Sequence, residues 1–289
     1  MATESACTLR MEAGVCARHL RICLRERSWQ GSQGNWAGAG IGSSIDFQDH
    51  RPYMPGDDPR YIDWAAYARS GQTIMKLYRE EVSPRMDLVL DVSRSMFYDP
   101  DKRAQTLRLF FFCMESARAL NASLQVYLVS GGDCHQVDPD RLRDPEWEPE
   151  AVAESGGVPM LDRLPFRNNS IRLFLSDVLY DASPDLILRE LLRGKGRGVL
   201  LSPYLRREAD PDWHGNMELR ECERGWIRRQ RVDASLLKRY REAYMRHIQS
   251  WRDTCRRYQT GMARVPGDCG LADALREEAI PNGLVELWG

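Results

Sequence analysis

Three side chains at alternate positions, Asp91, Ser93 and Ser95, are the residues of this chain best suited to chemistry. They follow a short apolar run that ends at the acid. One carboxylate and two hydroxyls form an all-oxygen set, which hard cations such as Mg²⁺ or Mn²⁺ prefer. A second acid, Asp177, closes another apolar run, residues 171–176. We predict that Asp91, Ser93, Ser95 and Asp177 together form a metal site.

Apolar runs of this length are typical of buried strands in a parallel sheet. Strands and helices are predicted to alternate along the chain: strands over 87–90, 124–129, 171–176 and 198–201, and helices over 101–121 and 184–193. This alternation predicts an α/β domain with a doubly wound, mostly parallel sheet of the Rossmann type. In the common strand order 3-2-1-4-5, the first and fourth strands are neighbours, and ligands bind at their carboxyl ends. Asp91 and Asp177 would meet there.

The segments around this core predict additions to it. A helix is predicted over 9–29, a glycine-rich connector over 31–42, a strand over 74–78, an extended loop over 133–149, strand-like segments over 217–222 and 226–232, and a long helix over 233–259 with Asp233 as its N-cap. The predicted organisation is therefore an N-terminal helix and linker (1–34), a β-containing extension (35–85), the α/β domain (86–262) and a C-terminal tail (263–289).

The composition and net charge of the chain exclude several classes of protein. The chain has 289 residues, of which 43% are hydrophobic and 29% charged, so it can bury a core. A net charge of -1 gives no general attraction to nucleic acid or anionic membranes. We find neither the stretch of about 18 apolar residues that a membrane span needs nor a secretory signal. The eight cysteines form no CxxC pair, so we expect reduced thiols in a cytoplasmic protein.

A second metal site is conceivable at Cys16, His19 and Cys23, which would lie on adjacent turns of the predicted helix. No fourth ligand occurs at a spacing usual for zinc. The favoured interpretation is a helix face that carries small apolar thiols.

The pattern Asp-x-Ser-x-Ser with a later strand-end acid resembles the metal-ion-dependent adhesion site of von Willebrand factor A domains. Upstream, residues 51–64 read Arg-Pro-Tyr-Met-Pro-Gly-Asp-Asp-Pro-Arg-Tyr-Ile-Asp-Trp, and Ala68-Arg69 and Glu80-Glu81 follow. This run resembles the signature of the bacterial family of unknown function numbered fifty-eight, whose members carry an A-type domain. The resemblance covers roughly residues 35 to 260.

The resemblance implies binding rather than catalysis. In A domains the two serines coordinate the ion directly, the acids act directly or through water, and a carboxylate from the partner fills the open position. Members of the family often occur beside MoxR-type AAA+ ATPases. The implied function is therefore a non-enzymatic adaptor or chaperone component that binds a MoxR-like ATPase, or another protein that offers an acidic side chain, through Mg²⁺ or Mn²⁺. Nucleic acid is not an implied partner.

One departure from the family pattern concerns a threonine that A-type sites take from a loop between the two acids. The loop 154–161 resembles the family's Gly-Gly-Thr-Pro-Leu pattern, but Val158 stands at the threonine position. Ser155 or a water molecule could replace the missing hydroxyl. Val158 therefore supports an alternative function, a scaffold with a degenerate, metal-free site.

A less favoured alternative is a metal-dependent, phosphatase-like hydrolase with Asp91 as its nucleophile. Ser93 stands where such enzymes carry their general acid, and a serine hydroxyl transfers protons poorly at neutral pH. The five histidines are scattered, and neither HExxH nor GxSxG occurs.

The acids of residues 51–64 also have two interpretations. Asp57, Asp58 and Asp63 could perform acid/base chemistry, but no partner nucleophile or base is evident. A turn at Pro55-Gly56-Asp57-Asp58, tied to Arg51 and Arg60, is the favoured interpretation.

Overall fold

The structure is a computed structural model that describes residues 4–23, 45–80, 83–150, 157–223 and 225–288. The chain divides into two compact units. One contains Met1–Ser32 with Pro84–Gly289, and the other contains Gln33–Ser83. The two units are described separately. No helix in the described part of the chain is both long enough and apolar enough to span a membrane.

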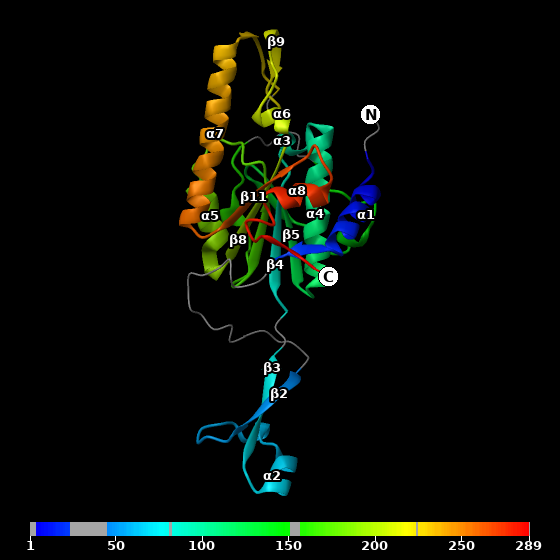
Figure 1. Cartoon of the computed structure of the whole chain (residues 1–289), viewed down its shortest axis with the longest axis vertical. Coiled ribbons are helices and arrows are strands. Elements are labelled where there is room, and N and C mark those ends of the chain that lie inside the picture. The colour runs from blue at the N-terminus through cyan, green and yellow to red at the C-terminus, as the bar shows by residue number, and fades with distance from the viewer. Residues whose placement is uncertain (1–3, 24–44, 81–82, 151–156, 224, 289) are drawn as a thin grey trace. The chain divides into compact units, whose positions relative to one another are not determined.

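A six-stranded sheet forms the centre of the larger unit (Figure 1), with the strand order β11-β8-β7-β4-β5-β6. Its strands are β4 (Arg85–Asp91), β5 (Ser123–Ser130), β6 (Asp133–Gln136), β7 (Ile171–Leu175), β8 (Arg197–Tyr204) and β11 (Gly261–Pro266). All neighbours pair in parallel except β6, which is antiparallel to β5. Counted along the chain, this order is 3-2-1-4-5-6. The predicted doubly wound, mostly parallel α/β fold is confirmed.

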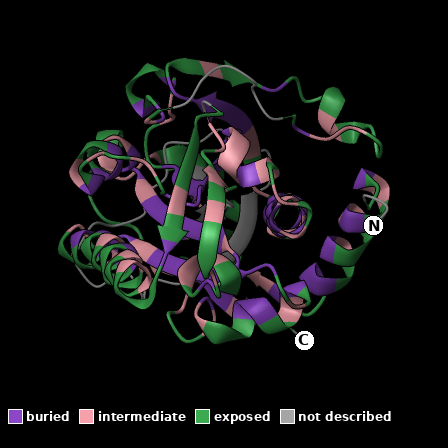
Figure 2. Cartoon of the chain, turned by 90° about the horizontal axis from the view of Figure 1, so that it is seen from above, coloured by how far each residue is buried: buried purple, intermediate pink, exposed green. Residues whose placement is uncertain are grey.

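Helices cover both faces of this sheet, because successive residues of a strand point to opposite sides. Leu88 and Leu90 pack into the hydrophobic cluster that contains α1, α4 and α8. Val89 packs into a second cluster, with α5 and α7. The helices are α1 (Ala6–Ala17), α3 (Arg94–Phe97), α4 (Pro100–Ala119), α5 (Pro184–Leu192), α6 (Arg206–Ala209), α7 (Ala234–Arg257) and α8 (Leu271–Glu277). Figure 2 shows buried residues on the central strands and exposed residues on the outer faces of helices.

The long helix α7 begins as predicted. The side chain of Asp233 accepts a hydrogen bond from the Leu236 backbone N–H at 2.8 Å, which is an N-cap. Its buried residues include Ile248 and Trp251, so the predicted apolar stripe faces the core. Before α7, the strands β9 (Gly215–Arg220) and β10 (Ile227–Val232) form an antiparallel hairpin.

The ends of the chain differ from prediction. The helix predicted over 9–29 ends at Ala17, and the prediction is wrong for residues 20–22, whereas residues 24–29 lie outside the described residues. The chain then forms β1 (Leu20–Ile22), which pairs with β12 (Val285–Leu287). This pairing supplies backbone hydrogen bonds that a longer helix would have made internally. Residues 263–289, assigned to a tail by sequence, include α8 and β12 of the same unit.

The strand β1 also changes the surroundings of Cys16, His19 and Cys23, because they no longer occupy one helix face. Within the part of the chain that the structure describes, no group of three or more His, Cys, Asp or Glu side chains could hold a metal ion. The extended loop predicted over 133–149 begins with the edge strand β6. The glycine-rich connector lies outside the described residues.

The smaller unit contains β2 (Ile45–Pro52) and β3 (Ile74–Glu80), which pair antiparallel, with α2 (Trp64–Ser70) between them in sequence. Arg51 donates two hydrogen bonds to Asp57, at 2.8 and 2.6 Å. Arg60 pairs with Asp58 at 2.6 Å. The acids of residues 51–64 therefore have the structural contacts expected of an arginine-tied turn.

Candidate metal-type site

Asp91, the last residue of β4, lies at the carboxyl end of the sheet and is 1% exposed. Its Oδ1 accepts a hydrogen bond from the Ser93 backbone N–H at 3.0 Å, and its Oδ2 accepts one from the Ser176 hydroxyl at 2.7 Å. Burial, and then the nearby charge of Asp177, raise the pKa of Asp91 to about 7. No ion pair links Asp91 to a lysine or arginine among the residues that the structure describes. Asp91 is therefore a buried acid without a cationic partner among the described residues.

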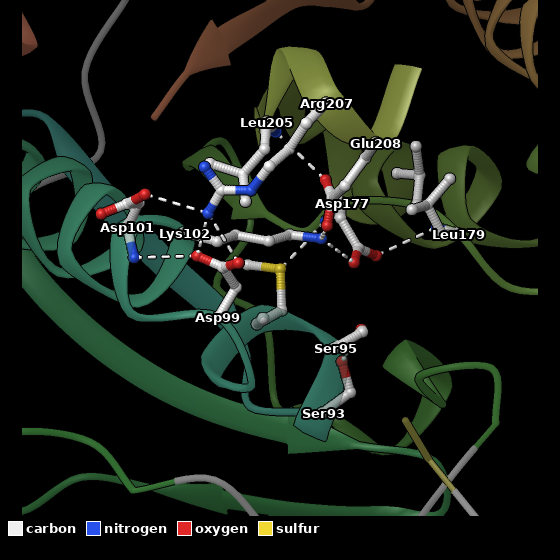
Figure 3. A network of polar contacts seen from close by, with 12 residues as sticks. Ser93, Ser95, Asp99, Asp101, Lys102, Asp177, Leu179, Leu205, Arg207 and Glu208 are labelled. Carbon is white, nitrogen blue, oxygen red and sulfur yellow. Dashed lines mark hydrogen bonds and ion pairs between the residues drawn. The ribbon is translucent and has the colours of Figure 1, made fainter. Parts of the chain in front are cut away.

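The two serines lie in the turn that follows β4. Ser93 occupies the N-cap position of α3, but its side chain makes no capping hydrogen bond. Instead its hydroxyl oxygen lies 3.1 Å from that of Ser95 (Figure 3). The capping role that serine usually has at this position does not explain Ser93. The two hydroxyls are paired beside Asp91, as a shared ligand set requires.

Asp177 lies two residues beyond β7, next to β4 in the sheet, so the predicted convergence of the two acids is present. Its Oδ2 accepts a hydrogen bond from the Nζ of Lys102 at 2.8 Å, and its Oδ1 accepts one from the Leu179 backbone N–H at 3.0 Å. Burial tends to raise the pKa of Asp177, but the charge and hydrogen bond of Lys102 lower it below its ordinary value. Asp177 is therefore ionised in the fold.

Lys102, on the first turn of α4, was not predicted to belong to this site. Its Nζ bonds both Asp177 and Oε1 of Glu208, the latter at 3.0 Å (Figure 3). Burial disfavours its charge, but these two carboxylates raise the pKa of Lys102 above its ordinary value. The sequence offered no signal of this role, because Lys102 stands between Asp101 and Arg103 in the polar first turn of the helix. The ammonium supplies part of the positive charge that the acids require.

The residue after Asp177 has a strained backbone. Val178 is buried and has φ +56°, in the left-handed region that a β-branched residue rarely adopts. Its N–H donates to the Ser176 hydroxyl at 3.1 Å, and its carbonyl lies 2.7 Å from the Nε2 of His247 on α7. Such strain persists only where the surroundings impose it, and it often marks a functional loop. Here it lies in the loop after β7, directly after Asp177.

A third acid also reaches the turn that carries the serines. Glu223, between β9 and β10, accepts hydrogen bonds from the backbone N–H groups of Ser95 at 2.8 Å and Arg94 at 3.3 Å. This contact could not be inferred from the sequence, because Glu223 lies more than a hundred residues away from Ser95 along the chain.

The donor atoms of these residues are of the chemical type that a hard divalent cation prefers. The donors are oxygens, and the Asp91 carboxylate has no cationic partner among the described residues. An ion bound there would depend on the hydroxyls of Ser93 and Ser95. Val158, at the expected threonine position, is half-buried against the cluster that contains Val129. Ser155, the suggested substitute, lies outside the described residues.

Comparison with known proteins agrees with the signature in residues 51–64. Residues 49–127 match the family model described as "Protein of unknown function DUF58". No curated protein matches the sequence.

Two solved structures are similar to this chain. One is the conserved hypothetical protein BatB from Bacteroides thetaiotaomicron, with 12% identity and a TM-score of 0.38. The other is an aerotolerance-related membrane protein from Bacteroides fragilis NCTC 9343 with multiple mutations to serines, with 11% identity and a TM-score of 0.32. Each alignment covers 69% of this chain and 98% of the other. TM-scores this low support no conclusion about function. The match to the family model covers part of the chain, residues 49–127, which include Asp91, Ser93 and Ser95.

Proposed function

We propose that this protein is a non-enzymatic binding module with a metal-ion-dependent adhesion-type site formed by Asp91, Ser93, Ser95 and Asp177. The observation that carries the proposal is the pair of serine hydroxyls, 3.1 Å apart, beside a buried acid that has no cationic partner among the described residues. Mg²⁺ or Mn²⁺ bound there would supply an electrophilic position for a carboxylate of a partner. A MoxR-like AAA+ ATPase is the first candidate partner, with this protein as its adaptor or chaperone component.

The surroundings favour binding over hydrolysis. Both acids accept two hydrogen bonds each, and Asp177 is neutralised by Lys102. Among the described residues, no hydrogen bond joins a histidine to Asp91 or Asp177, whereas His247 bonds a backbone carbonyl. These hydrogen bonds hold both acids in fixed positions, which suits ligands of an ion.

Titration calorimetry tests the metal site. Mg²⁺ and Mn²⁺ are titrated into the wild type, Asp91→Ala and Asp133→Ala. Asp133 is an exposed acid on β6, so its variant controls for the loss of one carboxylate from the same sheet. We expect saturable binding to the wild type and to Asp133→Ala, and none to Asp91→Ala. Wild-type protein that binds neither ion would contradict the metal-dependent function.

Co-purification tests the partner. A MoxR-like ATPase is expected to be retained by the wild type with Mg²⁺, and to be lost on chelation or in Asp91→Ala. If the wild type retains the ATPase neither with Mg²⁺ nor with chelator, the ATPase partnership is contradicted. That result would not contradict the proposed metal site.

The second candidate is a scaffold whose site works without metal. Two observations favour it: the ammonium of Lys102 already neutralises Asp177, and the Val158 side chain packs against apolar neighbours. This candidate predicts that Asp91→Ala binds the partner as well as the wild type does, with or without chelator.

A further inference from the structure

We propose that the outer edge of strand β10 is a docking site for an extended, acidic segment of a partner protein, which pairs with β10 as a third strand. The surface belongs to the β9–β10 hairpin and uses no metal ion. The inference therefore goes beyond the function proposed above and does not depend on it.

The hairpin is a sheet of only two strands. Its strands pair from Gly215 with Val232 to Arg220 with Ile227, and in the described part of the chain neither of them pairs with a further strand. Figure 1 shows the hairpin at the same end of the larger unit as α3 and α6. A two-stranded ribbon is only marginally stable by itself, and a further strand stabilises it. The hairpin therefore has an edge to which a partner strand can be added.

The hydrogen bonding of the hairpin leaves the outer edge of β10 open. The Glu221 N–H donates to the Trp226 carbonyl at 2.8 Å, so these opposite residues form a bonded pair. Bonded and non-bonded pairs alternate along antiparallel strands, and the backbone groups of non-bonded pairs point away from the neighbouring strand. In β10 these groups belong to Ile227, Arg229 and Arg231. Within the described residues, no backbone hydrogen bond from a turn, loop or cap reaches them.

The same residues contribute to a positively charged face of the hairpin. Ile227, Arg229 and Arg231 are exposed. So are Glu218 and Arg220, which lie opposite them on β9 and therefore share their face. The other face of the hairpin is the more buried one. An extended segment with acids at alternate positions would place these acids on the arginine-rich face, because side chains two residues apart in a strand point to the same side.

The arginines of β10 are accessible to a partner. Arg229 pairs with Glu218 at 3.0 Å, but its side chain is 86% exposed, and exposed ion pairs contribute little free energy. Ile227, which is 52% exposed, adds an apolar contact nearer the tip. A carboxylate from a partner can therefore replace Glu218 at Arg229, while a second carboxylate binds Arg231 two residues further along the strand.

The open edge favours a polypeptide over a nucleic acid. When a strand is added to a sheet, backbone hydrogen bonds provide affinity and side chains at alternate positions provide specificity. A nucleic acid could bind the arginines, but it has no peptide backbone to pair with the edge. The net charge of -1 also gives no general attraction to nucleic acid. An acidic strand is the partner that uses both the edge and the arginines.

Calorimetry with a synthetic peptide tests the surface in the presence of a metal chelator. The peptide, acetyl-Thr-Glu-Thr-Glu-Thr-Val-Thr-amide, matches the spacing of Arg231, Arg229 and Ile227 with its two acids and its valine. We expect the wild type to bind it. The variant Arg229→Gln/Arg231→Gln should bind it about 10-fold more weakly, because two exposed ion pairs are lost. The control Lys238→Gln/Arg246→Gln removes two exposed cations from α7 and should bind like the wild type.

A further variant, Glu218→Gln, should change the affinity in the opposite direction. It removes the acid that competes with the peptide for Arg229, so we expect binding about 2-fold to 3-fold tighter than that of the wild type. An affinity equal to or below that of the wild type would show that the acids of the peptide do not reach Arg229, and it would overturn the proposal.

Residue-resolved amide hydrogen exchange tests strand pairing directly. Bound peptide should slow the exchange of the Ile227, Arg229 and Arg231 amides. The Arg228 and Gln230 amides already point towards β9, so their exchange should change little. A second peptide, with proline in place of the two threonines that flank the inner glutamate, keeps both acids but cannot donate the backbone hydrogen bonds of a strand. We expect it to bind at least about 10-fold more weakly than the threonine peptide.

Different results would overturn the edge site for different reasons. Equal affinity for the proline and threonine peptides would indicate charge attraction without strand pairing. A single-stranded oligodeoxythymidine that binds more tightly than the peptide would identify a nucleic-acid surface instead. Peptide binding that requires Mg²⁺ would overturn the edge site and support the metal-dependent function. A wild type that binds no peptide would overturn the edge site and leave the metal-dependent function untouched, because chelator is present.

Discussion

Lys102 and Asp177 form an ion pair in the interior of the larger unit, with Nζ and Oδ2 2.8 Å apart and side chains 1% and 2% exposed. The pair connects the first turn of α4 to the loop after β7. Because Glu208 on α6 also accepts from Lys102, three segments distant in sequence are joined at the carboxyl end of the sheet. The ammonium is thus both a structural link and the counter-charge of a predicted metal-site residue.

Replacing Lys102 by methionine should destabilise the protein. The change leaves Asp177 buried without its cation, which typically costs about 3–5 kcal/mol of unfolding free energy. Chemical denaturation measures the loss. The control is Lys238→Met on α7, where the lysine is 78% exposed and 4.0 Å from Glu242, and where we expect almost no change. The double variant Lys102→Met/Asp177→Asn should lose less than the sum of the single losses. Additive losses would show that the pair is not coupled.

Asp91 should make stability depend on pH. Its pKa is raised from 3.8 to about 7 in the fold, so between these values the folded state keeps a proton that the unfolded chain has released. The stabilisation is present below the ordinary pKa and disappears as pH rises towards 7. The slope approaches about 1.4 kcal/mol per pH unit. Denaturation is measured with chelator at several pH values, on the wild type and Asp91→Asn.

The difference between the two proteins isolates Asp91, because other titrating groups are common to both. We expect the stability of the wild type relative to Asp91→Asn to fall as pH rises from about 4 to 7. A difference that stays constant over this range would show that Asp91 titrates near its ordinary pKa.

The central part of the site could be predicted from sequence because its determinants are local. Asp91 and Asp177 each end an apolar run, and the alternation of strands and helices fixes which strands are neighbours. Lys102 and Glu223 could not be predicted, because their partners lie far away in sequence: Lys102 bonds Asp177, and Glu223 accepts from the Ser95 N–H. The β1–β12 pairing was missed for a related reason: three-residue strands carry almost no periodicity, and their partners lie at opposite ends of the chain.

Threonine at position 158 should strengthen metal binding. Valine and threonine have similar shapes, and the substitution would restore the hydroxyl that A-type sites use. We expect Val158→Thr to bind Mn²⁺ about 10-fold more tightly, since one added oxygen ligand is worth at least as much as a supporting contact. Calorimetry measures the affinity. Val158→Ala is the control, because it changes the packing against the apolar cluster without adding an oxygen. Equal affinities in all three proteins would show that this loop does not reach the ion.

Asp63 should act as a helix cap rather than as an acid or base. The residue is 6% exposed, and its Oδ1 accepts hydrogen bonds from the Ala65 and Ala66 N–H groups, both at 3.0 Å. Asp63→Ala should destabilise α2 by about 1 kcal/mol, whereas Asp63→Asn should be close to the wild type, because asparagine caps helices equally well. Amide hydrogen exchange over residues 64–70 reports the change for α2 alone. If asparagine were as disruptive as alanine, the negative charge of Asp63, and not only its capping oxygen, would be required for the stability of α2.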